Sequence, residues 1–468
     1  MVKFRRSVSI EQFDLSLKQK IYGIKKGRNL METVYTSSWL NRLHLLSSRI
    51  LMPLMAVLFI CTNTVINLWI DERMETIQNI IAILLLLMVI CYLLSAPRER
   101  LRPWIKSNIL VIAYFVVRLI SLWQCGFDYS VIRTICFEMF FLIGICGFTV
   151  DSRTGNRFYV KFFIWFEVIA TALSALIFLL MPHLGANMQH MIIEFSYYEK
   201  AENAAFFSNV NTAGIMAGFS IVLAFIMYHK DMFAKKLIIA FGIYNICALL
   251  YFGSRAAEVG MAAVVLFFVI KKVFSGINAK KLTIVALCLM VLTLVPLYAM
   301  IGYHESQATL SYRGFERKLD NVSTGRYSIW KECYITQKDS LLVGMGNLKL
   351  EQDARKEMVA ANHCGEYWWY EMAAELGPHN GYISMISGAG WLGLLLFIAI
   401  LIQRIRRSKN LEKGNWYLML VFIFAINCFE SLFILNRFFA CFYMFLILES
   451  DWEGEEDTVT KNANLVKP

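Results

Sequence analysis

The sequence predicts an all-α polytopic membrane protein with about 12 transmembrane helices and one large extracytoplasmic loop between helices 9 and 10. Hydrophobic residues make up 58% of the chain and charged residues 17%, whereas soluble domains carry roughly 25% charged residues. Apolar runs of about 20 residues, the length that a membrane-spanning helix needs, recur from residue 50 almost to the C-terminus. These two observations leave no long polar segment for a second soluble domain.

The apolar runs divide the chain into three parts. Residues 1–49 form a basic cytoplasmic tail, residues 50–449 form the transmembrane domain, and residues 450–468 form an acidic cytoplasmic tail. Residues 303–378, inside the transmembrane domain, form the large loop. The expected spans lie near 50–70, 77–96, 107–124, 130–150, 158–181, 206–228, 237–252, 256–270, 282–302, 380–403, 416–431 and 436–449.

Lysine and arginine in the short connections predict the orientation of the spans. Basic clusters occur in the N-terminal tail and in every second connection, among them 97–106, 271–281 and 404–413. The short connections between them carry only single basic residues: Arg73, Lys200, Arg255 and Arg437. Both termini are therefore expected in the cytoplasm and residues 303–378 outside it. Because the net charge of +11 follows this pattern, DNA or RNA binding is not expected.

One apolar run requires a choice between one span and two. Residues 237–270 are interrupted by Gly253-Ser254-Arg255, and the run is too long for one span and short for two. A single span would place the lysines of 271–281 outside the cell, against the charge pattern. Two short helices joined by a tight turn keep the pattern, and Arg255 then lies over a cavity at the outer surface.

The loop 303–378 has an organisation of its own. Residues 325–338 have nearly helical apolar spacing and predict an amphipathic helix lying along the membrane surface. The turn Gly344-Met345-Gly346-Asn347 follows, then a charged stretch at 349–357 and an aromatic group at 367–370. The aromatic group either anchors the loop at the interface or stacks on sugars. A loop of this length is usually functional.

Three polar residues are expected to meet on the outer face, namely Arg255, Arg326 and His379. Two guanidinium groups match the geometry of a phosphate or pyrophosphate, and a histidine can take a proton from a hydroxyl near neutral pH. The set predicts group transfer from a lipid-linked phosphate donor to an alcohol. Each residue also has a structural interpretation: a snorkelling arginine, a solvated charge on a surface helix, and a helix cap.

Other polar residues fall inside or beside the spans. Arg133 and Glu138 either border a groove for the substrate or form a structural ion pair with Glu167, and Arg118 has no assigned role. Asn209 and Asn211 either line the cavity or cap the following helix. The acidic residues of the loop are Glu366, Glu371 and Glu375. They are too scattered to predict a metal site.

Four ordered pieces within residues 206–395 resemble the bacterial O-antigen ligase and O-antigen polymerase superfamily. In chain order the pieces are Phe207-Ser208-Asn209-Val210-Asn211-Thr212-Ala213-Gly214, Ser254-Arg255-Ala256-Ala257, Gly325-Arg326 with Trp330 and Gly344-Met345-Gly346, and Pro378-His379-Asn380-Gly381-Tyr382-Ile383 with Gly390-Trp391-Leu392-Gly393. The chain departs from the family where a proline commonly precedes the Gly-x-Gly turn, since Asp339-Ser340 stands there.

The resemblance implies an integral-membrane glycosyltransferase that uses glycans linked to undecaprenyl pyrophosphate. It assigns Arg255 and Arg326 to the pyrophosphate and His379 to activation of the acceptor hydroxyl, in an inverting, metal-independent transfer without a cofactor. We expect the substrate site to include four further residues: Asn211, Asn380, Arg133 and Tyr327.

The predicted function is a polysaccharide polymerase at the outer face of the bacterial cytoplasmic (inner) membrane, making O-antigen or capsule. Its partners would be a lipid-linked oligosaccharide donor and acceptor, membrane lipid and a chain-length regulator. One alternative is a ligase that moves the finished glycan to a different acceptor. Another is a flippase for lipid-linked oligosaccharides, although we find no repeat relating the two halves of the chain, which many transporters show.

Overall fold

The structure is a computed structural model that describes residues 105–139, 155–180, 204–229, 234–306, 318–361 and 374–432, apart from a few single positions, and isolated residues elsewhere. Outside these ranges lie the tails 1–49 and 450–468, most of the spans expected near 50–70, 77–96 and 436–449, and the aromatic group 367–370 with Glu366, Glu371 and Glu375. The described residues are mostly helical and contain no strand. The helices are α5 Ile109–Gln124, α6 Tyr129–Met139, α8 Gly155–Leu180, α10 Val210–His229, α11 Lys235–Phe252, α12 Arg255–Val273, α13 Ala279–Leu292, α14 Leu294–Ser306, α16 Arg326–Gln337, α17 Leu348–Ala361, α19 Gly381–Arg407, α20 Asn410–Lys413 and α21 Tyr417–Ile426.

Within the described ranges, four helical segments are long and apolar enough to cross a membrane: Val210–His229, Lys235–Phe252, Ala279–Tyr303 and Gly381–Arg407. Shorter apolar helices lie at Ile109–Gln124, Ile164–Leu180 and Tyr417–Ile426. These lengths and compositions agree with the expected all-α membrane protein. The number of about 12 spans remains a prediction from the sequence.

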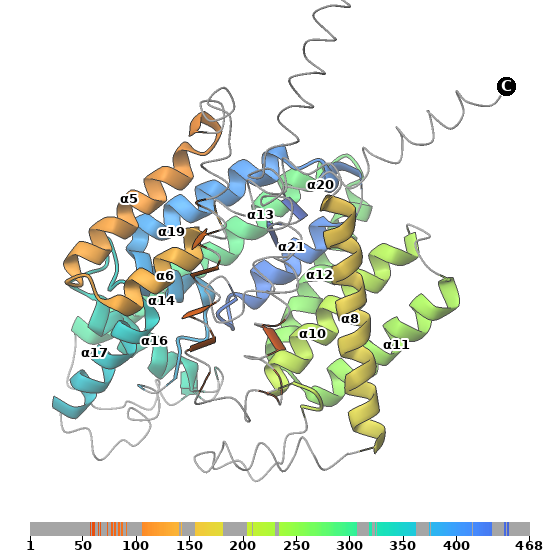
Figure 1. The fold of residues 1–468 in the computed structure, drawn as a ribbon, viewed down its shortest axis with the longest axis horizontal. Coiled ribbons are helices and arrows are strands. Elements are labelled where there is room, and N and C mark those ends of the chain that lie inside the picture. The colour runs from red at the N-terminus through yellow and green to blue at the C-terminus, as the bar shows by residue number, and fades with distance from the viewer. Residues whose placement is uncertain are drawn as a thin grey trace, which may run out of the picture.

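Helix α21 lies in the middle of the helical assembly (Figure 1). All ten of its residues are buried, and it packs against α10, α12 and α13. Helices α8, α10 and α11 lie on one side of it, and α19 packs along α5 on the other (Figure 1). Helix α21 ends at Ile426, earlier than the expected end of the span at residue 431. The residues that follow, 427–430, form a largely buried turn.

The break in the long apolar run 237–270 is a tight turn between two helices, as predicted. Helix α11 ends at Phe252 and α12 begins at Arg255. Gly253 has a φ of 59°, and its N–H donates to the carbonyl of Leu249 at 3.2 Å. This left-handed C-cap is the conformation that glycine adopts without steric cost.

Helix α19 was expected as a continuous span over 380–403, but it is kinked at Gly390, where φ is 68°. The amides of Trp391 and Leu392 donate to the carbonyls of Leu341 and Leu342 at 2.8 and 3.1 Å. Carbonyls of the loop therefore accept from the two amides that have no partner within the helix because of the kink. Irregular backbone is tolerated inside a membrane protein where other parts of the protein satisfy its polar groups in this way.

Gly344 is required where the loop meets this kink. It has a φ of 77°, and a Cβ at this position would lie 2.5 Å from the backbone nitrogen of Gly390. We expect Gly344→Ala to lower the unfolding temperature of the detergent-purified protein by several degrees, because strain and a backbone clash add. Gly276→Ala is the control, since open space surrounds Gly276. Equal unfolding temperatures for the two variants would contradict this account of the kink.

The helix expected at 325–338 is α16, but its surroundings differ from a surface helix. It packs between α14, α17 and α19, and polar residues along it are buried as well as apolar ones, including Lys331, Glu332 and Gln337. The charged stretch 349–357 belongs to a second helix, α17. Apolar spacing alone did not show that Glu332 on α16 lies 3.9 Å from Arg355 on α17, and that Arg355 lies 2.7 Å from Glu351. These three side chains are buried between the two helices, whereas Lys356 and Glu357 on α17 are exposed.

Arg118, which had no assigned role, joins three elements at the buried end of the loop. Its Nε donates to Glu138 at 2.6 Å, its Nη2 donates to the carbonyl of Gly346 at 2.8 Å, and its Nη1 donates to the carbonyl of Gly388. Glu167 instead accepts from the Ser220 hydroxyl at 2.9 Å. The structure therefore pairs Glu138 with Arg118, and the charge inside α5 holds the loop turn against the kink of α19.

Candidate functional site

The candidate site forms where the start of α19 meets the end of α21. The Gly381 amide donates to the Asn427 carbonyl at 2.8 Å, and the Asn380 side-chain amide donates to the Cys428 carbonyl at 2.9 Å. Asn380 also caps α19, because its Oδ1 accepts from the amides of Tyr382 and Ile383 at 3.0 Å. These bonds bring His379 beside the turn that follows α21.

Glu430 is the centre of this site. Its Oε1 accepts from Arg326 Nη2 at 3.1 Å and from Asn211 Nδ2 at 3.0 Å, and its Oε2 lies 3.3 Å from His379 Nδ1. The Glu430 side chain is 1% exposed, whereas Arg326 is 14% and His379 30% exposed. One buried carboxylate therefore gathers three donors from α10, α16 and the start of α19, and the donors remain partly open to the exterior.

Arg255 is connected to this cluster by Ser254, the residue that precedes it in the chain. The Ser254 hydroxyl donates to Asn211 Oδ1 at 3.4 Å, so the same asparagine joins the α11–α12 turn to Glu430. Ser254 is buried and the Arg255 side chain is exposed. The turn thus places a second guanidinium at the edge of the site.

Of the remaining residues considered in the sequence analysis, some lie beside the Glu430 cluster and others make contacts elsewhere. Tyr327 is buried in α16 directly after Arg326, and Asn380 is buried as a helix cap. Arg133 instead donates to Asn79 Oδ1 at 3.3 Å, away from the described contacts of Glu430. Asn209 caps α10, since its Oδ1 accepts from the Thr212 amide at 2.8 Å. Of the two asparagines considered at this helix start, Asn211 faces the site and Asn209 is a cap.

Glu430 was missed by the sequence analysis. It falls at the end of the apolar run 416–431, and a carboxylate inside a span is costly enough to be a functional candidate by default. That argument singled out Arg118, Arg133, Glu138 and Glu167, and applied equally to Glu430. Its partners lie 219, 104 and 51 residues away in the chain, so no local spacing links them.

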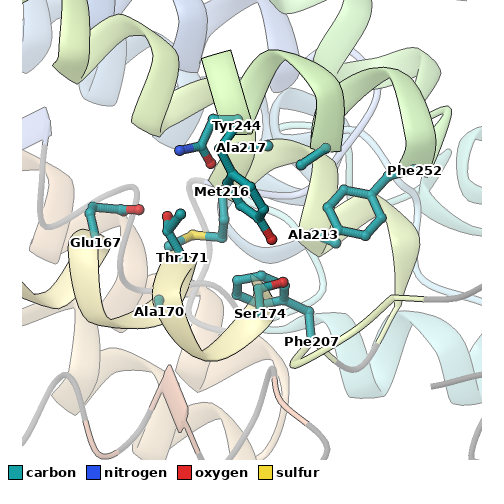
Figure 2. A pocket seen from close by; sticks show the side chains of 12 residues that line it. Glu167, Ala170, Thr171, Ser174, Phe207, Ala213, Met216, Ala217, Tyr244 and Phe252 are labelled. Atoms are coloured by element: carbon teal, nitrogen blue, oxygen red, sulfur yellow. The ribbon is translucent and has the colours of Figure 1, made fainter. Parts of the chain in front are cut away.

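A separate small pocket lies between α8, α10 and α11 (Figure 2). Thr171, Ser174 and Glu167 border it from α8, and Met216 and Tyr244 lie across from them (Figure 2). It touches Ala213, which is two residues beyond Asn211 and therefore on nearly the opposite face of α10. The pocket is thus divided from the Glu430 cluster by the helix itself.

A buried charge cluster connects the two loop helices behind the site. The Arg355 Nε lies 2.7 Å from Glu351 Oε1, and its Nη1 lies 3.9 Å from Glu332 Oε2. All three side chains are 0–1% exposed. Burial raises the pKa of Glu332 to about 8, with the charge of Arg355 only partly opposing this rise.

This raised pKa predicts a pH dependence of stability. Between pH 4.5 and about 8 the folded protein keeps a proton on Glu332 that the unfolded chain has lost, so stability falls as pH rises through this window. Glu332→Gln is expected to remove this part of the slope in unfolding temperatures measured from pH 5 to 9. Asp339→Asn, on an exposed residue, should keep the wild-type slope. A Glu332→Gln slope equal to that of wild type would contradict a protonated Glu332.

The comparisons with known proteins agree with the sequence pattern. Residues 240–398 match the family model described as O-antigen ligase, a range that contains Arg255, Arg326 and His379 but not Asn211 or Glu430. This match confirms the resemblance to the O-antigen ligase and polymerase superfamily over these residues, and together with the apolar helices it indicates an integral inner-membrane protein. No curated protein and no solved structure matches the chain significantly.

Proposed function

From the O-antigen ligase family match over residues 240–398, we propose that the chain is a membrane glycosyltransferase acting on undecaprenyl-pyrophosphate-linked oligosaccharides. In this proposal it polymerises repeat units into a surface polysaccharide at the outer face of the inner membrane. The observation that carries it is the convergence of Arg326, His379 and Asn211 on the single carboxylate of Glu430. Such a cluster combines an anion-binding group with an oriented base.

Arg255 and Arg326 would hold the pyrophosphate of the donor. Each guanidinium can form two parallel hydrogen bonds to phosphate oxygens. When the bond between the anomeric carbon and the phosphate oxygen breaks, negative charge collects on the departing pyrophosphate, and fixed positive charge stabilises it there. Pyrophosphate leaves readily under these conditions, so the proposed transfer requires neither a metal ion nor a proton donor for the leaving group.

His379 would act as the general base. Because a carboxylate can only accept hydrogen bonds, a contact between Glu430 Oε2 and His379 Nδ1 at 3.3 Å places the proton on Nδ1. The other ring nitrogen, Nε2, is then free to accept the proton of an acceptor sugar hydroxyl. The deprotonated oxygen attacks the anomeric carbon from the face opposite the pyrophosphate, which inverts the configuration.

Glu430 would serve both halves of the reaction. It orients His379 and stabilises the imidazolium that forms when the proton is transferred. It also pairs with Arg326 at 3.1 Å, which fixes the guanidinium in a partly buried position. With one carboxylate against two arginines, the formal charge of the group remains +1 while His379 is neutral, and this favours an anionic donor.

Ligase activity is the second candidate, and the description of the matching family favours it. Donor chemistry is the same for both, so the acceptor decides between them. The test is to incubate the purified protein with lipid-linked repeat units in the presence of a chelator and to resolve the products by mass spectrometry. A ladder of products from repeat units alone supports a polymerase. A single transfer that needs an added acceptor supports a ligase, and absence of any transfer with either acceptor overturns the proposal.

A further inference from the structure

His379 has a backbone conformation that a non-glycine residue rarely adopts. Its φ is 45°, in the left-handed region, and such strain persists only where the surroundings over-determine it. The segment before it, Gly377-Pro378, allows no regular secondary structure, so contacts from other elements have to fix the direction of the imidazole.

Two side chains of the loop helices donate to carbonyls of this segment. The indole Nε1 of Trp330 donates to the Pro378 carbonyl at 2.8 Å, and Nη2 of Arg355 donates to the Leu376 carbonyl at 2.7 Å. Trp330 is four residues beyond Arg326, one turn along α16. The helix that carries the proposed donor-binding arginine therefore also holds the peptide that carries the proposed base.

Arg355 is itself immobilised before it reaches this carbonyl. Its side chain is 0% exposed and lies 2.7 Å from Glu351, which is one turn earlier on α17, and 3.9 Å from Glu332 on α16. A buried guanidinium that is paired with Glu351 and also contacts Glu332 is costly to displace. The charge cluster thus makes α16, α17 and the segment 376–379 a connected unit.

We propose that Trp330 and Arg355 are positioning residues for His379: they fix the left-handed peptide that aims its imidazole at Glu430 and at the acceptor hydroxyl. This rests on the role proposed for His379 above. Neither residue touches the substrate. They act through the Pro378 and Leu376 carbonyls, so they determine how often His379 is aligned and not whether donor binds.

The test uses Trp330→Phe, which removes the indole N–H and keeps an aromatic ring, and Arg355→Lys, which keeps the charge but loses the planar fork. Both are expected to lower kcat about tenfold to 100-fold with little change in the KM for the donor. Matched controls are Trp123→Phe, since Trp123 is 74% exposed, and Lys356→Arg, the exposed neighbour of Arg355 on α17. Both controls should behave as wild type.

A second readout does not depend on activity. The rate at which diethyl pyrocarbonate modifies His379, followed by mass spectrometry, should rise in Trp330→Phe and Arg355→Lys because the imidazole leaves Glu430. If wild-type protein shows no glycan transfer but His379 is modified faster in the two variants than in wild type, the positioning role is supported and the proposed function fails. Unchanged modification rates together with unchanged kcat in Trp330→Phe overturn the positioning role, even where Arg355→Lys fails to fold.

Discussion

His379→Ala is expected to lower kcat by about 10²–10⁴-fold, the range typical for loss of a general base. The acceptor hydroxyl would have to be deprotonated by water, whereas the two arginines proposed to hold the donor would remain. The KM for the donor should therefore change little. The measurement is initial-rate kinetics of glycan transfer by detergent-purified protein, with donor and acceptor varied separately.

The control for this variant is His229→Ala, because His229 is an exposed residue at the end of α10 whose ring contacts the Phe225 carbonyl. It should keep the wild-type rate. A His379→Ala variant with full activity would contradict the role of the base and would fit the flippase alternative, in which the cavity matters more than any one proton acceptor.

Glu430→Gln is expected to separate catalysis from donor binding. The amide is nearly isosteric and can still accept from Asn211, but it lacks the charge that we propose orients His379 and stabilises its protonated form. Loss of an orienting carboxylate lowers kcat by about 10²-fold or more. At the same time Arg326, which lies 3.1 Å from Glu430, loses its counter-charge, so the KM for the anionic donor should fall or stay constant.

The matched control is Glu357→Gln, since Glu357 is an exposed carboxylate on α17, and it should leave both constants unchanged. A raised donor KM with unchanged kcat in Glu430→Gln would mean that this carboxylate only supports the shape of the donor site. Unchanged values of both constants would remove Glu430 from the mechanism altogether.

The sequence allowed correct prediction of features that depend on local pattern and on charge placement. The turn at Gly253-Ser254-Arg255 followed from basic residues on either side of it, and the structure has this turn between α11 and α12. The range of α16 followed from apolar spacing. Both inferences needed only residues of the same or the adjoining stretch of chain, where hydropathy, charge placement and turn chemistry can be read directly.

Features that depend on distant contacts were missed. The kink of α19 at Gly390 is stabilised by the carbonyls of Leu341 and Leu342, which a hydropathy pattern does not reveal. The burial of α16 depends on Arg355 of α17, which lies 3.9 Å from Glu332 and 2.7 Å from Glu351. Glu430 belongs to the site only because the turn after α21 bonds to the start of α19, a pairing across roughly 50 residues of chain.

The most direct test of the central claim is the stoichiometry of the reaction. Purified protein would be given lipid-linked repeat units in chelator, and released undecaprenyl pyrophosphate and new glycosidic bonds would be counted by mass spectrometry at successive times. The account predicts one lipid pyrophosphate released for each glycosidic bond formed, with both products lost together in Arg326→Gln. Lipid-linked glycan that crosses proteoliposomes intact, with neither product formed, would contradict it.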